Sequence, residues 1–276
     1  MSRIQNILDK ADREGVLHRV RAVAEVAPEP AAATIDADPA FMARISIPTD
    51  APAATAVPAA TAVRIVHGAH LSPVLVAATA ANGPVAEQYR ALRTRLLQGD
   101  QRACHVLMVT SPGPREGKSL TTSNLGLTMA QEFQRRSCIV DADLRSPQIG
   151  RLFGIPDGPG LSDVLVGNAA LEDALVMLED QNVTILPAGH AAAHPAELLA
   201  TTAMRRLLDQ LRSQFDRIVI DTPSASPLAD VGILAPLVDS VVLVVRAGVT
   251  STPSIHDAIA TIDATKLLGI VLNEAQ

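Results

Sequence analysis

The chain has 276 residues, of which 48% are hydrophobic and only 2% aromatic, and its formal net charge is −6. The length suits one large domain or a domain with appendages, and the few aromatic side chains and negative charge argue against nucleic-acid binding. A core built from Leu, Val, Ile and Ala is typical of a buried parallel sheet.

The first 63 residues differ in composition from the rest of the chain. Residues 1–25 place Ile4, Ile7 and Leu8 at helical spacing with charges between them, which predicts an amphipathic helix that docks on a partner, lies on a membrane or has no stable role. Residues 26–63 are rich in Ala and Pro and predict a disordered linker. Apolar runs are too short for a membrane span and no signal-peptide core is present, so we expect a cytoplasmic protein.

From residue 64 onward, strand-like and helical segments alternate. Apolar runs predict strands at 105–110, 138–143, 183–189, 217–223, 240–248 and 267–273, and helical periodicity predicts helices at 118–134, 161–178, 195–214, 228–237 and 254–264. This alternation predicts an α/β domain over 64–276 with a doubly wound, mostly parallel sheet and helices on both faces. Such sheets bind ligands at the carboxyl ends of their strands.

A charged segment, "EQYRALR", precedes the first predicted strand of the core. Its spacing places Glu87, Arg90 and Arg93 along one helix face. A solvent-exposed charged face is the ordinary interpretation of these residues taken alone. The only tyrosine of the chain, Tyr89, lies within this segment.

The loop after the strand at 105–110 has the features of a phosphate-binding loop. It departs from the GxxxxGK[ST] pattern because Pro112 stands at the first glycine, yet Gly117, Lys118 and Ser119 follow and a helix begins there. Backbone amides at a helix N-terminus bind anions, so the segment can hold phosphate. The alternative interpretation is an ordinary Gly/Pro turn before a helix. We predict that the nucleotide contacts Gly113, Pro114, Arg115, Glu116, Gly117, Lys118, Ser119 and Leu120, although Arg115 could equally point to solvent.

Aspartates end two of the predicted strands. Asp141 and Asp143 lie in "IVDADLR" and fall on the same side of an extended chain, while Asp221 ends "IVID". A lone Asp after a strand is usually a helix cap or a turn residue. Two such strand ends beside a phosphate loop predict carboxylates that hold Mg²⁺ and orient a nucleophile.

Three motifs together resemble the bacterial tyrosine kinase (BY-kinase) family of capsule and exopolysaccharide synthesis, of the CpsD/CapB type. They are "PREGKS" at 114–119, "VDADLRSP" at 140–147 and "VIDTP" at 219–223, similar to that family's Walker A, A′ and B motifs. The resemblance implies a P-loop NTPase fold related to MinD and ParA, with ATP and Mg²⁺ as cofactors. It also implies a protein-tyrosine kinase that regulates polysaccharide synthesis or export.

The same resemblance assigns roles to individual residues. Lys118, Asp141 and Asp143 are the expected catalytic residues, and Ser119, Asp141 and Asp221 the expected Mg²⁺ ligands; Arg145 and Asn273 are candidates for contact with substrate or nucleotide. Glu87, Arg90 and Arg93 match the ExxRxxR pattern that mediates ring assembly in the family. The implied partner is a membrane polysaccharide chain-length regulator, which would recruit the protein to the inner face of the cytoplasmic membrane.

One family feature does not match. The family usually has a tyrosine-rich tail that neighbours in the ring phosphorylate, and the sequence carries only Tyr89. The acceptor tyrosine is therefore open, and a ParA/MinD-like ATPase switch without phosphotransfer, or a nucleotide-binding scaffold, remain as alternatives.

The remaining metal- and redox-active side chains have simpler interpretations. Cys104 and Cys138 show no CxxC spacing, so we expect buried, reduced thiols. His190 and His194 are four residues apart, but the flanking sequence predicts a loop that enters a helix and lacks the glutamate of HExxH. We therefore expect no zinc site there.

Overall fold

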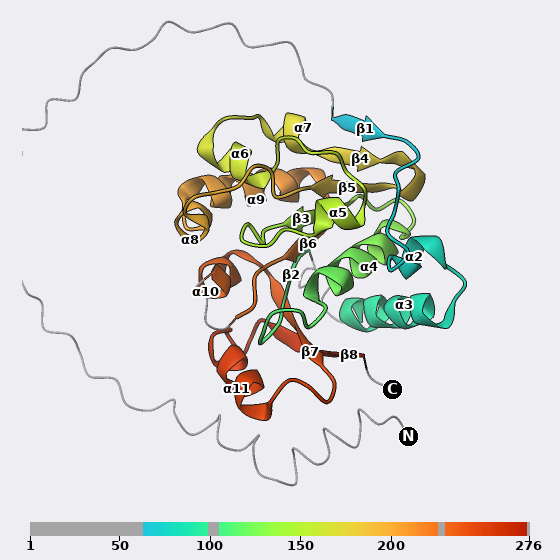
Figure 1. Ribbon diagram of the computed structural model, residues 1–276, viewed down its shortest axis with the longest axis vertical. Coiled ribbons are helices and arrows are strands. Elements are labelled where there is room, and N and C mark those ends of the chain that lie inside the picture. Colours follow the sequence, from blue (N-terminus) through green and yellow to red (C-terminus); the bar gives the residue numbers. More distant parts are fainter. Residues whose placement is uncertain (1–62, 99–104, 226–229, 275–276) are drawn as a thin grey trace, which may run out of the picture. The chain divides into compact units, whose positions relative to one another are not determined.

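The computed structural model describes residues 63–98, 105–225 and 230–274 (Figure 1). The helix predicted at 1–25, nearly all of the linker predicted at 26–63, and Cys104 lie outside these residues.

A single sheet runs through the described part of the chain, in the order β1-β4-β5-β3-β6-β2-β7-β8 (Figure 1). Neighbouring strands are parallel except β4 and β5, which are antiparallel. The strands are β1 (Arg64–Val66), β2 (Val106–Thr110), β3 (Ser137–Asp141), β4 (Val176–Leu178), β5 (Val183–Leu186), β6 (Arg217–Asp221), β7 (Ser240–Arg246) and β8 (Leu267–Asn273). The predicted mostly parallel sheet is thus confirmed.

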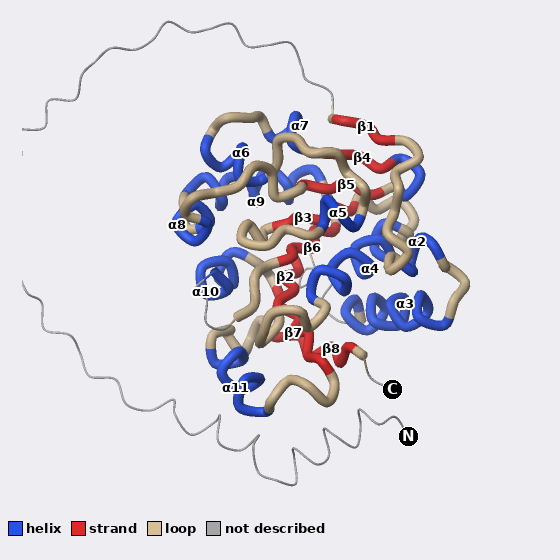
Figure 2. The backbone as a smooth tube through the Cα atoms, viewed as in Figure 1, coloured by secondary structure: helices blue, strands red, loops and turns tan. Residues whose placement is uncertain are grey.

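Helices flank the sheet (Figure 2). The α-helices are α2 (Val76–Thr79), α3 (Pro84–Leu97), α4 (Lys118–Ala130), α5 (Ile149–Leu152), α6 (Leu161–Val166), α7 (Leu171–Ala174), α8 (Pro195–Leu199), α9 (Thr202–Gln214), α10 (Asp230–Leu234) and α11 (Thr252–Ala260). Short 3₁₀ helices occupy Glu179–Gln181 and Ala235–Leu237. Among the described helices, none combines the length and apolar character that a bilayer crossing requires.

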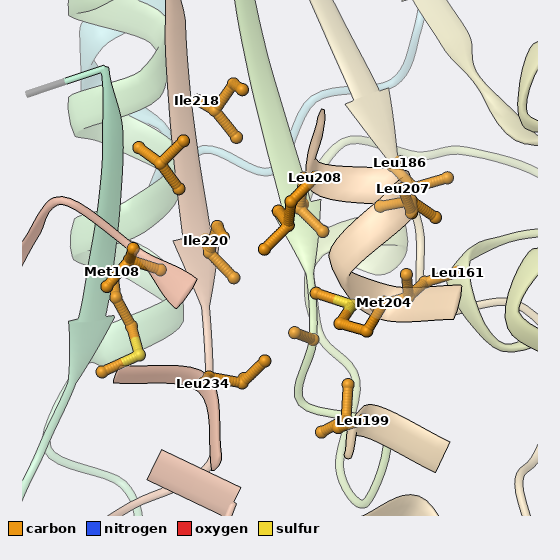
Figure 3. Packing of buried hydrophobic residues seen from close by; sticks show 14 of the residues in the cluster. Met108, Leu161, Leu186, Leu199, Met204, Leu207, Leu208, Ile218, Ile220 and Leu234 are labelled. Carbon is orange, nitrogen blue, oxygen red and sulfur yellow. The ribbon is translucent and has the colours of Figure 1, made fainter. Parts of the chain in front are cut away.

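Alternation along the buried strands divides the core between two faces. In β2, Leu107 and Val109 pack with Leu125 of α4, whereas Val106 and Met108 belong to the larger cluster on the opposite face. That larger cluster includes Met204, Leu207 and Leu208 of α9 and Leu234 of α10 (Figure 3). Both faces of the central strands are therefore buried, which explains why the strands are continuously apolar.

Several predicted boundaries are wrong. The helix predicted at 161–178 ends at Val166 because Gly167 adopts a left-handed φ of 81°, and the chain continues through α7 into β4. The helix predicted at 195–214 is two helices, since Thr201 is extended (φ −71°, ψ 158°). The three-residue strands β1 and β4 were not predicted, because they are too short to produce a period in the sequence.

Candidate active site

The phosphate loop joins β2 to α4 and is closed by the end of β8. Gly117 has a φ of 93°, and a Cβ atom added to it would lie 2.0 Å from Nδ2 of Asn273. That Nδ2 donates a hydrogen bond to the carbonyl oxygen of Glu116 at 3.0 Å. Gly117 is therefore required both by its backbone conformation and by the close approach of Asn273.

Of the two residues before Gly117, Glu116 is buried and Arg115 is exposed. Glu116 is buried, and its Oε1 accepts a hydrogen bond from Thr250 at 2.9 Å, while its Oε2 has no hydrogen-bond partner among the described residues. Burial raises the pKa of Glu116, against the opposing effect of Thr250. Arg115 is exposed and has a φ of 61°, a conformation that costs a residue with a side chain about 1–2 kcal/mol.

Lys118 begins α4 and contacts the carboxylates of the adjacent strands. Its Nζ donates to Oδ2 of Asp143 at 2.6 Å and lies 4.0 Å from Oδ2 of Asp221. Burial alone would lower the pKa of Lys118, but the charges of Asp221 and Asp143 outweigh it and raise the pKa. The ammonium group is thus held charged at the N-terminus of a helix whose first amides are free to bind an anion.

The sheet register brings the predicted carboxylates together. Asp141 ends β3 opposite Asp221, which ends β6. Asp141 is fully buried; its Oδ2 accepts backbone hydrogen bonds from Gln148 at 3.1 Å and Ile149 at 2.9 Å. Burial and the neighbouring Asp221 raise the pKa of Asp141, and burial also raises that of Asp221, against the opposing charge of Lys118.

The donor set fits a divalent cation. Oδ2 of the fully buried Asp221 accepts no hydrogen bond in the described part of the chain and lies 4.0 Å from the Lys118 ammonium, so it can also act as a ligand to a metal ion. Its Oδ1 accepts a hydrogen bond from Thr122 at 3.3 Å. Ser119, the predicted hydroxyl ligand, is buried in the first turn of α4 next to Lys118. Carboxylate and hydroxyl oxygens are the ligands that Mg²⁺ prefers.

The other residues of the predicted nucleotide-binding set, Gly113, Pro114 and Leu120, lie on the same loop and on the first turn of α4. The side-chain hydrogen bonds of Arg145 to described residues go to Asp230, outside the cluster: its Nε donates to Oδ2 of Asp230, at the start of α10, at 2.9 Å. Asp230 was not predicted as a site residue, because an aspartate in the first turn of a helix carries no sequence signal that sets it apart.

The residues expected to mediate assembly lie on α3. Glu87 pairs with Arg90 at 2.7 Å, and Arg93 donates to the carbonyl oxygen of Thr128 on α4 at 2.5 Å. The phenol of Tyr89 is half-buried, and burial raises its pKa against a hydrogen bond with Thr121. All three charged residues and the only tyrosine in the sequence therefore make contacts within the chain itself.

His190, the first histidine of the predicted pair, contacts a carboxylate. His190 Nδ1 lies 2.8 Å from Oδ1 of Asp163, and no group of three potential metal ligands occurs among the residues that the structure describes. Cys138 is a buried free thiol whose pKa is raised by burial, as expected for a core residue.

Comparison with known proteins gives a consistent set of relatives. The chain is 32% identical over 216 residues to the tyrosine-protein kinase YwqD of Bacillus subtilis, and the aligned region covers 77% of this chain and 90% of YwqD. It is 31% identical to the succinoglycan biosynthesis transport protein ExoP of Rhizobium meliloti over 61% of this chain and 22% of ExoP. No protein-family model matches the chain.

Solved structures agree. The kinase domain of VpsO is 36% identical and superposes with a TM-score of 0.65, covering 70% of this chain and 95% of that domain. The septum site-determining protein MinD from Pyrococcus horikoshii, complexed with Mg-ADP, is 24% identical with a TM-score of 0.50, covering 61% of this chain and 69% of MinD. At that identity the second likeness concerns the fold, which is the P-loop NTPase fold predicted from the sequence.

Proposed function

The chain belongs to the bacterial tyrosine-kinase family, and from this premise we propose that it binds ATP with Mg²⁺ and phosphorylates tyrosine to regulate polysaccharide synthesis or export. The observation that carries the proposal is the cluster in which Lys118 lies 2.6 Å from Asp143 and 4.0 Å from Asp221, next to a loop that only glycine can complete at Gly117. Positioned charges of this kind supply most of the catalysis in phosphoryl transfer.

Each residue of the cluster has a proposed task. The backbone of residues 113–120 cradles the phosphates, and Lys118 neutralises charge on the γ-phosphate. Ser119, Asp141 and Asp221 would hold Mg²⁺, which when bound spreads the negative charge of the phosphates. Asp143 is the proposed base, because one of its oxygens faces Lys118 and the other accepts only the Ser146 amide at 3.0 Å among the described residues.

The reaction conserves atoms and charge in a simple way. The bond between the γ-phosphorus and the bridging oxygen breaks, a bond forms between that phosphorus and the tyrosine oxygen, and ADP leaves. The phenolic proton passes to Asp143.

The acceptor is proposed to lie on another molecule. Tyr89 is the only tyrosine of the chain, and its phenol is half-buried against Thr121. The relatives include a polysaccharide transport protein, which supports a membrane chain-length regulator as the partner. That partner would recruit the kinase to the inner face of the cytoplasmic membrane, and Glu87, Arg90 and Arg93 would mediate assembly of identical subunits. The segments predicted as a helix at 1–25 and a linker at 26–63 are proposed to connect the domain at 64–276 to that partner.

Labelled phosphate transfer tests the proposal. Purified protein is incubated with γ-labelled ATP and Mg²⁺, alone and with the cytoplasmic segments of its membrane partner, beside a Lys118→Met variant checked for unchanged melting. We expect label on partner tyrosine that is lost in the variant. Free phosphate without labelled protein would contradict the kinase proposal and favour the ATPase switch.

A further inference from the structure

An ion pair outside the nucleotide cluster joins two parts of the chain that flank the site. Asp230 is fully buried, and Arg145 donates to its two carboxylate oxygens, from Nε at 2.9 Å and from Nη2 at 3.5 Å. No other hydrogen bond to this carboxylate occurs among the residues that the structure describes. A buried carboxylate that loses its partner is strongly destabilised, so the pair resists separation.

The Arg145 side of the pair belongs to the loop that carries the proposed base. Asp143 stands two residues before Arg145, and its Oδ1 accepts a hydrogen bond from the Ser146 amide just after it. The loop then returns to Asp141, whose Oδ2 accepts from the amides of Gln148 and Ile149. Residues 142–149 thus fold around the two carboxylates, and the side chain of Arg145 within this stretch pairs with Asp230.

The Asp230 side of the pair belongs to α10, which is packed into the core. Val231 and Leu234 of α10 are fully buried in the larger core cluster, where Leu234 lies with Met108 and Ile220 (Figure 3). The Arg145 side chain itself is 38% exposed. The pair therefore fastens an otherwise exposed stretch of loop to an anchored helix.

We propose that Arg145 is a positioning residue, which acts through Asp230 to hold the loop of Asp143 in the geometry needed for phosphoryl transfer. The inference rests on the proposed function, since it assigns the base to Asp143. Misplacement of a reacting group by about 1 Å can cost on the order of 100-fold in rate. The backbone amides of residues 113–120, which bind the phosphates, lie on a different segment, so the KM for ATP should change less than kcat.

Steady-state kinetics of Arg145→Gln, Asp230→Asn and the double variant test the proposal. We expect each single change to lower kcat by about 10- to 100-fold, with the KM for ATP within about twofold of wild type. Because the two residues act as one unit, the double variant should be no slower than the slower single variant. Losses that multiply in the double variant would overturn the proposal and show that Arg145 contacts the substrate directly. Arg145→Lys should recover part of kcat, since it keeps the charge but not the planar fork.

A control ion pair is available near the amino end of β7, away from the carboxyl ends of the strands where the site lies. Arg212 pairs with Asp239 through Nη1 at 2.9 Å and Nη2 at 2.7 Å, just before β7 begins. Arg212→Gln should lower the melting temperature and leave kcat unchanged. A fall in kcat in this variant would show that any lost ion pair slows the enzyme, which contradicts a specific role for Arg145.

Hydrogen exchange gives a readout that does not require catalysis. We expect the backbone amides of residues 142–149, apart from Pro147, to exchange at least about tenfold faster in Arg145→Gln, and not in Arg212→Gln. Unchanged exchange in Arg145→Gln would overturn the inference. If wild-type protein transfers no phosphate, the proposed function fails, and the exchange experiment still decides whether Arg145 holds the loop.

Discussion

Replacement of Gly117 by alanine perturbs the phosphate loop in a way that the structure allows to be quantified. The left-handed φ of 93° costs a residue with a side chain about 1–2 kcal/mol. The new Cβ would lie 2.0 Å from Nδ2 of Asn273, so that side chain must leave and its hydrogen bond to Glu116, worth about 1 kcal/mol, is lost. The total is about 2–3 kcal/mol.

The cost of Gly117→Ala should appear either in the stability of the protein or in its affinity for nucleotide. If the empty loop keeps its shape, the free energy of unfolding in urea falls by about 2–3 kcal/mol. If the empty loop relaxes, nucleotide binding must restore the original shape, and the affinity for a fluorescent ATP analogue falls by about 30- to 140-fold. The two losses should therefore add up to about 2–3 kcal/mol.

Two further variants separate the causes. Gly150→Ala in α5 is the control, because a Cβ there meets nothing within 4 Å, so stability and affinity should hold or rise slightly. Asn273→Ala opens the space next to Gly117. Adding Gly117→Ala to that variant should therefore cost only the about 1–2 kcal/mol of the left-handed backbone conformation. Stability and affinity of Gly117→Ala both within about 0.5 kcal/mol of wild type would refute the reasoning.

Three other predictions concern the core, the assembly helix and the metal site. Leu208→Ala should lower the free energy of unfolding by about 2–5 kcal/mol in urea, with kcat unchanged; a smaller loss would mean that the core closes around the cavity. The Glu87 side chain is 70% exposed, so Glu87→Ala should reduce assembly measured by sedimentation while changing the free energy of unfolding by less than about 0.5 kcal/mol. Arg93→Ala should lower both assembly and the free energy of unfolding, because the hydrogen bond to the Thr128 carbonyl is lost. Equal effects of the two variants on the free energy of unfolding would count against this distinction. Asp221→Asn should abolish the effect of Mg²⁺ on nucleotide affinity measured by calorimetry with and without EDTA, and a retained Mg²⁺ effect would argue against Asp221 as a ligand.

The sequence predicted the centre of the sheet better than its edge. Strands β2, β3, β6 and β7 are buried on both faces, and such strands are continuous apolar runs that stand out in any sequence. The segment 161–178 was predicted as one helix because two short helices and a three-residue strand share the composition of one longer helix. Tertiary pairing with β5, rather than local preference, decides its conformation.

The site shows the same division between local and long-range information. Lys118 and the three aspartates could be predicted because each stands at a strand end or helix start within a local motif. The contacts that hold them could not: Asn273 reaches Glu116 across 157 positions and Arg145 reaches Asp230 across 85. Asn273 was expected to contact substrate or nucleotide, and its observed hydrogen bond goes to the loop itself; its contact with nucleotide stays a prediction.

The position of β2 between β6 and β7 has a consequence for the growing chain on the ribosome. Val106 of β2 pairs with Ile218 of β6, so roughly 110 residues must be added before the neighbouring strand exists. At about 5–20 residues per second, this takes about 6–22 s. During that time an apolar strand with two unpaired edges has emerged without the partners that will cover it, and such edges promote association with other chains. Yield of the protein in cells should therefore depend more on translation speed and chaperone supply than its final stability suggests.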